Sequence, residues 1–480
     1  MTPEGHDLVE FVTGQRWFGS KTRDVVHASI IDRAIVSSGE PAVELLLVEI
    51  RFDTGTHDTY QLLRGADLDV LSEPDAATAL VRLIRRGTTV GGQEGTVELI
   101  PVPASFAGIP EDVAVTRQVD AEQSNSSVVL GDLLILKVFR RLEPGINPEI
   151  DIGRFLTETV AFPHVPPLLG AVELEEDGTR NAVAVVHGFV QNQGDAWTVT
   201  SAYLDRFVEE QRLLRAEAAG ESDELGAYLL RMQQVGRRVA ELQRALASRD
   251  DLADFAPEPI TPDDVRRWKD DVLMRAQRAF DALARRRADL TDNDCQLVDA
   301  LLSHRDALAD RLGEMLPDHV EAMKIRHHGD FHLGQMLIVK DDVSIIDFEG
   351  EPRRSIDQRR RKAPAARDVA GLIRSLDYSV TAALERALKS APDEDGRIAR
   401  AVDGWRERSV TAFLAAYRQS LNEPLLWPRA PEDADRLLDF FLLEKAFYEI
   451  EYELAHRPDW LRVPLAGTWR ILAHPELAPA

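Results

Sequence analysis

The chain has 480 residues, of which 44% are hydrophobic and 29% charged, and its formal net charge is −25. This hydrophobic content is enough for the cores of two or three domains and excludes an intrinsically disordered chain. The negative charge disfavours nucleic acid as a partner, because an acidic surface repels the phosphate backbone. A single cysteine, Cys295, allows no internal disulfide and no thiolate metal site, so we expect a cytoplasmic protein.

The first ten residues lack the basic and apolar segments of a signal peptide. The apolar runs, such as Ala182–Val186, are far shorter than the roughly 18 residues that a membrane helix needs. We therefore expect no targeting segment and no association with a membrane.

The N-terminal segment is predicted to contain strands and one helix. Between residues 25 and 64, the runs VELLLVEIRF and DTYQLLRG are separated by the turn DTGT, which predicts two strands joined by a turn. A helix is expected over Pro74–Arg86, with the proline at its start, and an extended segment over Thr96–Pro103. We interpret residues 1–108 as a small mixed α/β unit.

The next block predicts strand, turn, strand and helix, followed by a last strand near Ala182. From about Thr200 the pattern becomes helical. Between Tyr228 and Leu246 apolar residues recur at alternating spacings of four and three, which indicates one buried helix face. The fold class is therefore α+β, with expected divisions at 1–108, 109–195 and a mainly helical 196–480.

The segment KIRHHGDFHLGQMLIVKDDVSIIDFEGEP, which begins at Lys324, contains the residues that phosphoryl transfer requires. Two extended pieces around the DD turn would bring the Asp330 loop and the Asp347 loop to the same end of one hairpin. One carboxylate can orient and deprotonate an attacking hydroxyl, while a second carboxylate and the Gln335 amide oxygen can hold Mg²⁺ against ATP phosphates. Each acid alone is more typical of a turn or a strand end; together with the amide they predict a kinase-type site.

The other half of this site is predicted in QSNSSVVLGDLLILKVF. Its small polar residues form a turn whose backbone amides can approach phosphates, and Lys137 follows on an apolar strand. A buried lysine needs an anionic partner, so we expect ATP phosphate and an acid of the next helix, with Glu149, Asp151 and Glu158 as candidates. The alternative is an edge-strand lysine that reaches solvent. No GxxxxGK[ST] sequence is present, which favours a bilobal protein-kinase-like fold over a P-loop fold.

Seven segments make the chain resemble the bacterial maltokinases, a group of aminoglycoside-phosphotransferase-like kinases that also occurs in fusions with trehalose synthase. Gln335 stands where the wider superfamily usually has asparagine, and DFEGEP replaces the simpler DFG of protein kinases. The segments are FVTGQRWFGSK (11–21), EQSNSSVVLGDLLILKVFRRLEPGINPEIDIGRFLTE (122–158), NQGDAW (192–197), HGDFHLGQ (328–335), IDFEGEP (346–352), RDVAGLIRSLDY (367–378) and LLEKAFYEIEYEL (442–454).

The resemblance implies an N-terminal cap before two kinase lobes, a functional link with trehalose synthase, and ATP-dependent phosphorylation of maltose at its anomeric hydroxyl for α-glucan or glycogen synthesis. It implies that Asp330 is the catalytic base and that Gln335 and Asp347 hold magnesium. It also implies that Lys137 contacts the phosphates. The family's version of the following helix is expected to have a glutamate near the position of Asp151, and the aspartate of this chain is one methylene shorter, so the partner of Lys137 stays open. The implied phosphate loop consists of Ser124, Asn125, Ser126 and Ser127.

The acceptor site is expected on the segment LLEKAFYEIEYEL, where Glu444, Tyr448 and Tyr452 share a helix face. Glu449 and Glu453 lie beside them, and the alternative is an amphipathic helix whose acids face water. His332 is either a sugar contact or a structural hydrogen-bond partner. The basic run 353–362 either recognises phosphates or forms a salt-bridged loop. Glucosamine, glucose, an aminoglycoside-like acceptor or a binding-only pseudokinase remain alternatives to maltose phosphorylation.

Overall fold

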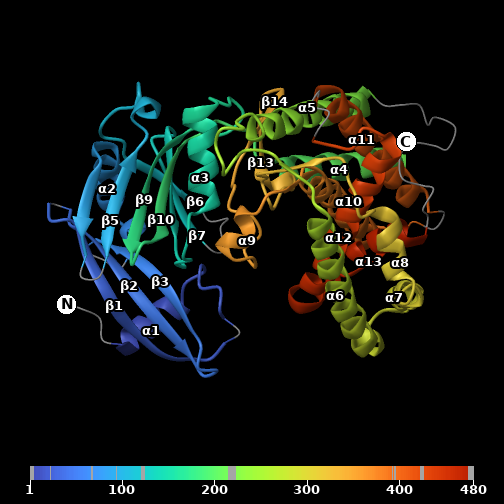
Figure 1. Ribbon diagram of the computed structural model, residues 1–480, viewed down its shortest axis with the longest axis horizontal. Helices are drawn as coiled ribbons and strands as arrows, with labels where there is room; N and C mark the ends of the chain where they lie inside the picture. Colours follow the sequence, from blue (N-terminus) through green and yellow to red (C-terminus); the bar gives the residue numbers. More distant parts are fainter. Residues whose placement is uncertain are drawn as a thin grey trace. The chain divides into compact units, whose positions relative to one another are not determined.

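The computed structural model describes residues 5–21, 23–39, 41–65, 69–92, 95–119, 125–213, 223–391, 393, 396–421 and 426–473. The chain forms two compact units (Figure 1). The N-terminal unit consists of residues 1–191 and 348–360, and the C-terminal unit consists of residues 192–347 and 361–480. The chain therefore leaves the C-terminal unit after Asp347 and adds a short segment to the N-terminal unit.

A three-stranded antiparallel sheet begins the N-terminal unit. Its strands are β1 (Val25–Ser37), β2 (Val43–Phe52) and β3 (His57–Arg64), and helix α1 (Gly5–Thr13) precedes them. Strands β2 and β3 are the two predicted from the sequence. The long β1 was not predicted, and its pairing with β2 contains three register shifts, which break the alternation that identifies a strand.

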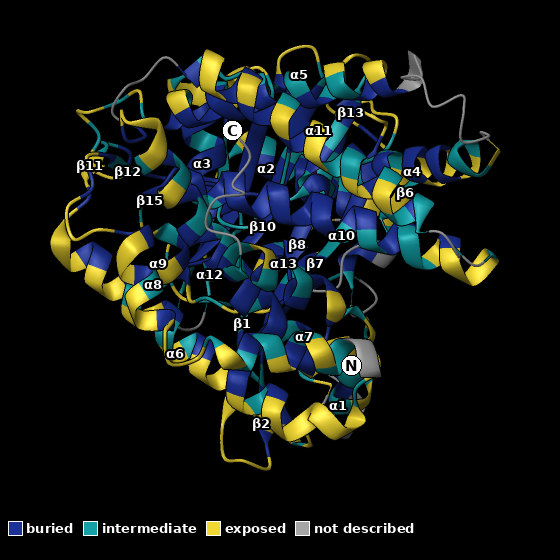
Figure 2. Ribbon diagram, turned by 90° about the vertical axis from the view of Figure 1, so that its right-hand side faces the viewer, coloured by how far each residue is buried: buried dark blue, intermediate teal, exposed yellow. Residues whose placement is uncertain are grey.

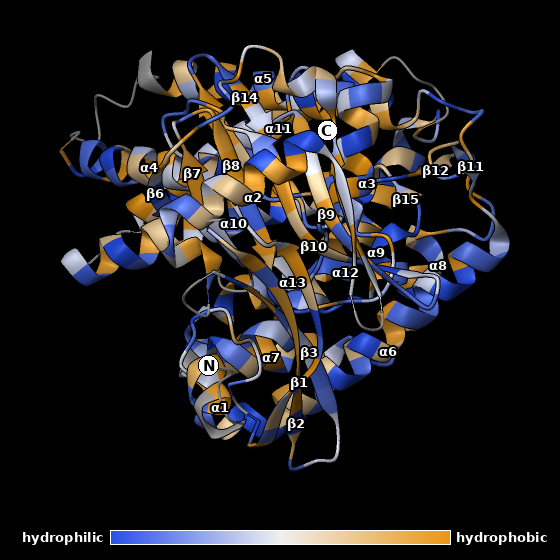
Figure 3. Cartoon of the chain, turned by 90° about the vertical axis from the view of Figure 1, so that its left-hand side faces the viewer, coloured by the Kyte–Doolittle hydropathy of each residue, from blue (hydrophilic) through white to orange (hydrophobic). Residues whose placement is uncertain are grey.

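The second sheet of this unit has the strand order β4-β5-β9-β10-β8-β7-β6. Helix α2 (Pro74–Arg86) coincides with its prediction, and Figure 3 shows hydrophobic residues along β9 and β10. Strands β4 and β5 precede residue 108, yet β5 pairs with β9 of this sheet. The predicted division between a cap of residues 1–108 and a kinase lobe of residues 109–195 stays a prediction. The strands are β4 (Thr88–Gly91), β5 (Thr96–Pro101), β6 (Val115–Val119), β7 (Asn125–Leu130), β8 (Leu134–Phe139), β9 (Leu168–Glu176) and β10 (Thr179–Gly188).

Short helices complete the N-terminal unit. Asn147 caps α3, because its side chain accepts a hydrogen bond from the backbone N–H of Glu149, and Pro148 occupies the first helical position. The helical elements are α3 (Pro148–Arg154), the π-helical turn η3 (Phe155–Thr159), the 3₁₀ turns η1 (Val70–Ser72) and η2 (Pro103–Phe106), and α9 (Ile356–Arg360).

The C-terminal unit is mainly helical. Glycine at position 236 lets α5 and α11 approach closely, because a Cβ there would lie 2.4 Å from the carbonyl oxygen of Phe413. Most of α10 between Ala366 and Ala383 is buried, whereas α6 has both buried and exposed faces (Figure 2). The helices are α4 (Ala196–Leu213), α5 (Asp223–Leu246), α6 (Pro262–Arg286), α7 (Asp292–Ser303), α8 (Leu308–Met315), α10 (Ala366–Ser390), α11 (Arg397–Leu421), α12 (Pro431–His456) and α13 (Arg462–Ala473).

Two small sheets lie in this helical unit. One has the order β11-β12-β15, and the other is the hairpin of β13 and β14, which was predicted around the DD turn. No helix among the described residues is long and apolar enough to cross a membrane. The remaining elements are β11 (Glu258–Pro259), β12 (Met323–Ile325), β13 (Met336–Val339), β14 (Asp342–Ile345), β15 (Ala363–Pro364) and the 3₁₀ turns η4 (Arg287–Asp289), η5 (Leu333–Gln335) and η6 (Pro458–Trp460).

Candidate active site

The Asp330 loop follows β12 and is held by the buried carboxylate of Asp368, at the start of α10. The backbone N–H of His328 donates to Asp368 Oδ2 over 2.8 Å, and that of Gly329 donates to Oδ1 over 3.0 Å. A Cβ at position 371 would lie 2.6 Å from the Phe331 carbonyl oxygen, so the helix backbone supports the loop at close range. Asp368 lies in the RDVAGLIRSLDY segment, but only the fold shows that it positions the loop.

The β13–β14 hairpin brings Gln335 to Asp347. Met336 pairs with Ile345 at the hairpin end, and Gln335 Nε2 donates to Asp347 Oδ2 over 3.0 Å. Asp347 has a φ of 65°, a backbone conformation that non-glycine residues rarely adopt. The hairpin thus sets a carboxylate and an amide side by side, as the sequence predicted.

His332 accepts a hydrogen bond from the Gly334 N–H at its Nδ1 over 3.0 Å, and its Nε2 lies 3.4 Å from Gln335 Nε2. Burial lowers the pKa of His332, and Lys445 acts in the same direction, whereas Asp330 opposes the shift. We therefore expect a neutral imidazole at pH 7. These contacts give His332 a structural role within η5; its role as a sugar contact stays a prediction.

Lys445 of α12 is a contact of Asp330 that sequence reasoning missed. Its Nζ lies 3.2 Å from Asp330 Oδ1 and 4.9 Å from the centre of the Tyr448 ring. The residues are 115 positions apart. The available signal was weak: Lys445 is the one basic residue of the helix between Arg436 and His456.

The predicted acceptor residues lie on α12, but their side chains have protein partners. Glu444 forms an ion pair with Arg367, and the Tyr448 and Tyr452 rings stack with centroids 6.4 Å apart. Glu449 and Glu453 are buried, so the alternative of acids facing water is wrong for both. Burial raises the pKa of Glu449, and Arg374 opposes the shift.

Lys137 lies on β8, between β7 and β10, so the edge-strand alternative is wrong. Its Nζ is 2.8 Å from Glu149 Oε2 and 2.5 Å from Glu349 Oε1. The other oxygen of Glu149 is 3.3 Å from His187 Nε2. Burial acts to raise the pKa of Glu149, but Lys137 and His187 outweigh it and lower the pKa to about 2.

The structure pairs Lys137 with Glu149, and it pairs Asp151 with Arg360, with Nη2 and Oδ2 3.4 Å apart. The role of Asp151 at the nucleotide site stays a prediction. Arg359 is buried and pairs with Glu143 over 2.9 Å. At Arg359 and Arg360 the structure therefore supports the interpretation of the basic run 353–362 as a salt-bridged loop.

The predicted phosphate turn is largely a strand. Ser124 lies outside the described residues, whereas Asn125, Ser126 and Ser127 begin β7, with Ser127 opposite Lys137. The Asn125 amide donates to Glu349 Oε1 over 2.7 Å, and Ser126 Oγ accepts from Arg140 Nε over 2.9 Å. The turn prediction is wrong for these three residues, because pairing with neighbouring strands outweighs their turn-forming chemistry.

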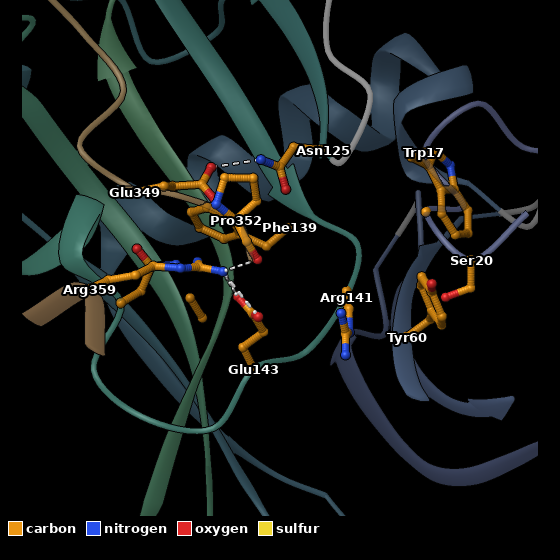
Figure 4. A pocket seen from close by; sticks show the side chains of 13 residues that line it. Trp17, Ser20, Tyr60, Asn125, Phe139, Arg141, Glu143, Glu349, Pro352 and Arg359 are labelled. Atoms are coloured by element: carbon orange, nitrogen blue, oxygen red, sulfur yellow. Dashed lines mark hydrogen bonds and ion pairs between the residues drawn. The ribbon is translucent and has the colours of Figure 1, made fainter. Parts of the chain in front are cut away.

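A cavity of about 220 Å³ in the N-terminal unit adjoins Asn125 and Glu349. Figure 4 shows Trp17, Ser20 and Tyr60 on one side and the Arg359–Glu143 pair on the other. The buried Arg140 contacts residues on either side of the N-terminal sheet in the sequence: its Nη2 lies 2.6 Å from Asp69 Oδ2, and its guanidinium lies 5.2 Å from the Trp17 ring centre. The same arginine that bonds Ser126 is therefore anchored by residues that precede β4.

The chain belongs to the phosphotransferase enzyme family, whose model matches residues 115–396. A second model, the maltokinase N-terminal cap domain, matches residues 11–94. These matches confirm the predicted kinase-like α+β fold with an N-terminal cap, and the resemblance that led to it.

Curated relatives cover nearly the whole chain. A glucosamine kinase from Streptacidiphilus jiangxiensis is 28% identical over 469 residues, which is 90% of this chain and 95% of the relative. A glucosamine kinase from Mycolicibacterium smegmatis is 27% identical over 432 residues, which is 85% of this chain and 96% of the relative.

Solved structures show the same fold. A glucosamine kinase in complex with glucosamine, ADP and inorganic phosphate is 23% identical with a TM-score of 0.66, covering 98% of this chain and 100% of that chain. Another glucosamine kinase structure, crystal form B, is 23% identical with a TM-score of 0.69. The match covers 97% of this chain and 99% of that chain.

Proposed function

We propose that the protein is an ATP-dependent sugar kinase that phosphorylates maltose at the anomeric hydroxyl and yields maltose 1-phosphate. The main support for the transfer chemistry is the Asp330 loop together with the Gln335–Asp347 pair. Gln335 Nε2 and Asp347 Oδ2 lie 3.0 Å apart. The match of residues 11–94 to the maltokinase cap supports maltose as the acceptor. The proposal includes the functional link with trehalose synthase, because the resemblance extends to fusions of the two enzymes.

In this proposal the Asp330 carboxylate accepts the proton of the acceptor hydroxyl. The sugar oxygen forms a bond to the γ-phosphorus, the bond from that phosphorus to the β–γ bridging oxygen breaks, and ADP leaves. Asp330 is suited to this role because Lys445 contacts only its Oδ1. Among the described residues, Oδ2 accepts no hydrogen bond and can receive the hydroxyl.

Gln335 and Asp347 fit a divalent cation, because a carboxylate and an amide oxygen are the hard donors that Mg²⁺ prefers. When bound, Mg²⁺ would neutralise the charge of the β- and γ-phosphates. We propose that Lys137 contacts those phosphates, with Glu149 orienting its ammonium over 2.8 Å. Asn125, Ser126 and Ser127 are the described residues of the proposed phosphate-binding segment.

Glucosamine is the second candidate acceptor, because the relatives from Streptacidiphilus jiangxiensis and Mycolicibacterium smegmatis are named glucosamine kinases. Glucose and aminoglycoside-like compounds are further alternatives. A pseudokinase that binds nucleotide without transfer is the non-enzyme alternative, and the acid, amide and lysine set argues against it.

A coupled ADP-release assay with maltose, glucose, glucosamine, trehalose and kanamycin tests the proposal. We expect the highest kcat/KM with maltose. The exposed Asp318 offers a matched control, because Asp318→Asn should leave turnover unchanged while Asp330→Asn lowers it by about 10²- to 10⁴-fold. A kcat/KM for glucosamine at least tenfold above that for maltose would overturn the maltose assignment, and no ADP release with any sugar would overturn the kinase assignment.

A further inference from the structure

Four glutamates in the C-terminal half of α12 are paired with arginines. Glu444 pairs with Arg367, and Glu449 Oε2 lies 2.6 Å from Arg374 Nη2. Glu451 lies 2.7 Å from Arg278, and Glu453 lies 2.7 Å from Arg457. The helix on which the sequence predicts the acceptor site thus has a guanidinium partner at each of these four carboxylates.

The charge next to the proposed base is positive. Lys445 and Asp330 are partly exposed, with 21% and 27% of their side chains accessible, so both can meet a small molecule. A second cation lies near the same tyrosine as Lys445: the guanidinium of Arg275 is 5.1 Å from the centre of the Tyr448 ring. An acceptor that reaches Asp330 therefore meets a lysine ammonium within the same few ångströms.

We propose that Lys445 is a specificity-determining residue that favours neutral sugars over amino sugars. This inference rests on the proposed function, in which the acceptor hydroxyl binds Asp330. A sugar hydroxyl can accept a hydrogen bond from the lysine ammonium, whereas the ammonium of an amino sugar is repelled by it. Discrimination by a repulsive group is effective, because like charges brought close in a partly buried site are costly.

Glucose and glucosamine provide the sharpest comparison, because they differ only at C2. N-acetylglucosamine is the control for bulk, because it is larger than glucosamine but neutral. The variants are Lys445→Gln, which removes the charge, and Lys445→Arg, which retains it. Lys269→Gln is the matched control, because Lys269 forms a comparable 3.0 Å ion pair with the exposed Asp318.

The measured quantity is the ratio of kcat/KM for glucosamine to that for glucose at constant pH and ionic strength. We expect Lys445→Gln to raise this ratio by about tenfold or more, with Lys445→Arg and Lys269→Gln close to wild type. The ratio for N-acetylglucosamine to glucose should change little. If Lys445→Gln has no turnover, the same ratio is taken from dissociation constants measured by calorimetry with a non-hydrolysable ATP analogue.

A ratio in Lys445→Gln within about twofold of wild type would overturn the inference while leaving the kinase assignment intact. A wild-type enzyme that prefers glucosamine to glucose by more than about tenfold would also overturn it. By contrast, a wild-type enzyme that phosphorylates no sugar contradicts the proposed function on which the inference rests.

Discussion

The Lys137 strand and the Lys445 helix each bring a lysine to carboxylates, but over different lengths of chain. Lys137 meets Glu149 within one strand–loop–helix segment, 12 positions along the chain. Lys445 meets Asp330 across 115 positions, through the packing of α12 against α10 in the helical unit. The first contact can be anticipated from a local pattern, whereas the second exists only once the whole unit has folded.

The two regions also differ in their balance of charge. Lys137 has two carboxylates within 2.8 Å, so the local group carries excess negative charge. On α12, the four glutamates Glu444, Glu449, Glu451 and Glu453 each have an arginine partner, and a lysine faces the proposed base. This difference is consistent with a phosphate-and-cation role for the first region and a neutral acceptor for the second.

The largest expected effect is that of Asp347→Ala. We expect no detectable phosphoryl transfer at millimolar Mg²⁺ and weaker ATP binding, because the substitution removes the carboxylate of the Gln335–Asp347 pair. The measurement is ADP release across a magnesium titration. Asp341→Ala is the control, since Asp341 is exposed at the turn of the same hairpin. Full activity of Asp347→Ala would show that the metal and nucleotide site lies elsewhere.

Asp330→Asn should lower kcat by about 10²- to 10⁴-fold while ATP binding survives, because the amide cannot accept the hydroxyl proton. Turnover and the ATP dissociation constant are measured in parallel. The same substitution removes the ionic partner of Lys445 and so tests whether that contact serves catalysis. Turnover near that of wild type would contradict the assignment of the base.

Arg374→Met tests the buried ion pairs that join α10 to α12. The substitution leaves Glu449 and Asp377 as buried acids without this arginine, and we expect a loss of about 3–5 kcal/mol in the free energy of unfolding. Arg418→Met breaks a more exposed pair with Asp435 and should cost at most about 1 kcal/mol. Urea denaturation measures both. Equal effects would mean that burial does not distinguish the two pairs.

The smallest expected effect is a pH dependence of stability from Glu149. Its pKa in the folded chain is lowered to about 2, below the ordinary value of 4.5. The stabilisation is therefore complete above about pH 4.5 and is lost as the pH falls through about 2, amounting to about 3 kcal/mol. Urea midpoints between pH 6 and pH 2 should fall less steeply in Glu149→Gln. Glu158→Gln, on the exposed end of the same segment, is the control, and identical slopes in wild type and Glu149→Gln would refute the prediction.

Local sequence patterns predicted the features that depend on neighbouring residues. The helix over Pro74–Arg86 follows from its content of alanine and charged residues and from the proline at its start, and the β13–β14 hairpin follows from the two extended pieces around the DD turn. The second prediction placed Gln335 and Asp347 together, which accounts for the central pair of the candidate site. Their roles in binding metal and in catalysis stay predictions.

The features that could not be predicted depend on orientation or on distant pairing. Glu149 and Asp151 lie two residues apart on α3, so their side chains point roughly 200° apart around the helix, and only its orientation decides which meets Lys137. The strand at Asn125–Ser127 forms because β6 and β8 supply partners for its backbone. Lys445 required the α10–α12 packing, for which no local signal exists.

The most direct test of the central claim is phosphorus NMR of the product formed from ATP and maltose, with Asp330→Asn as the control. We expect one new resonance, coupled to the anomeric proton of the reducing glucose, that appears with wild type and is nearly absent with the variant. A phosphate on a primary hydroxyl would contradict the maltokinase assignment. Equal product with Asp330→Asn would contradict the role of Asp330.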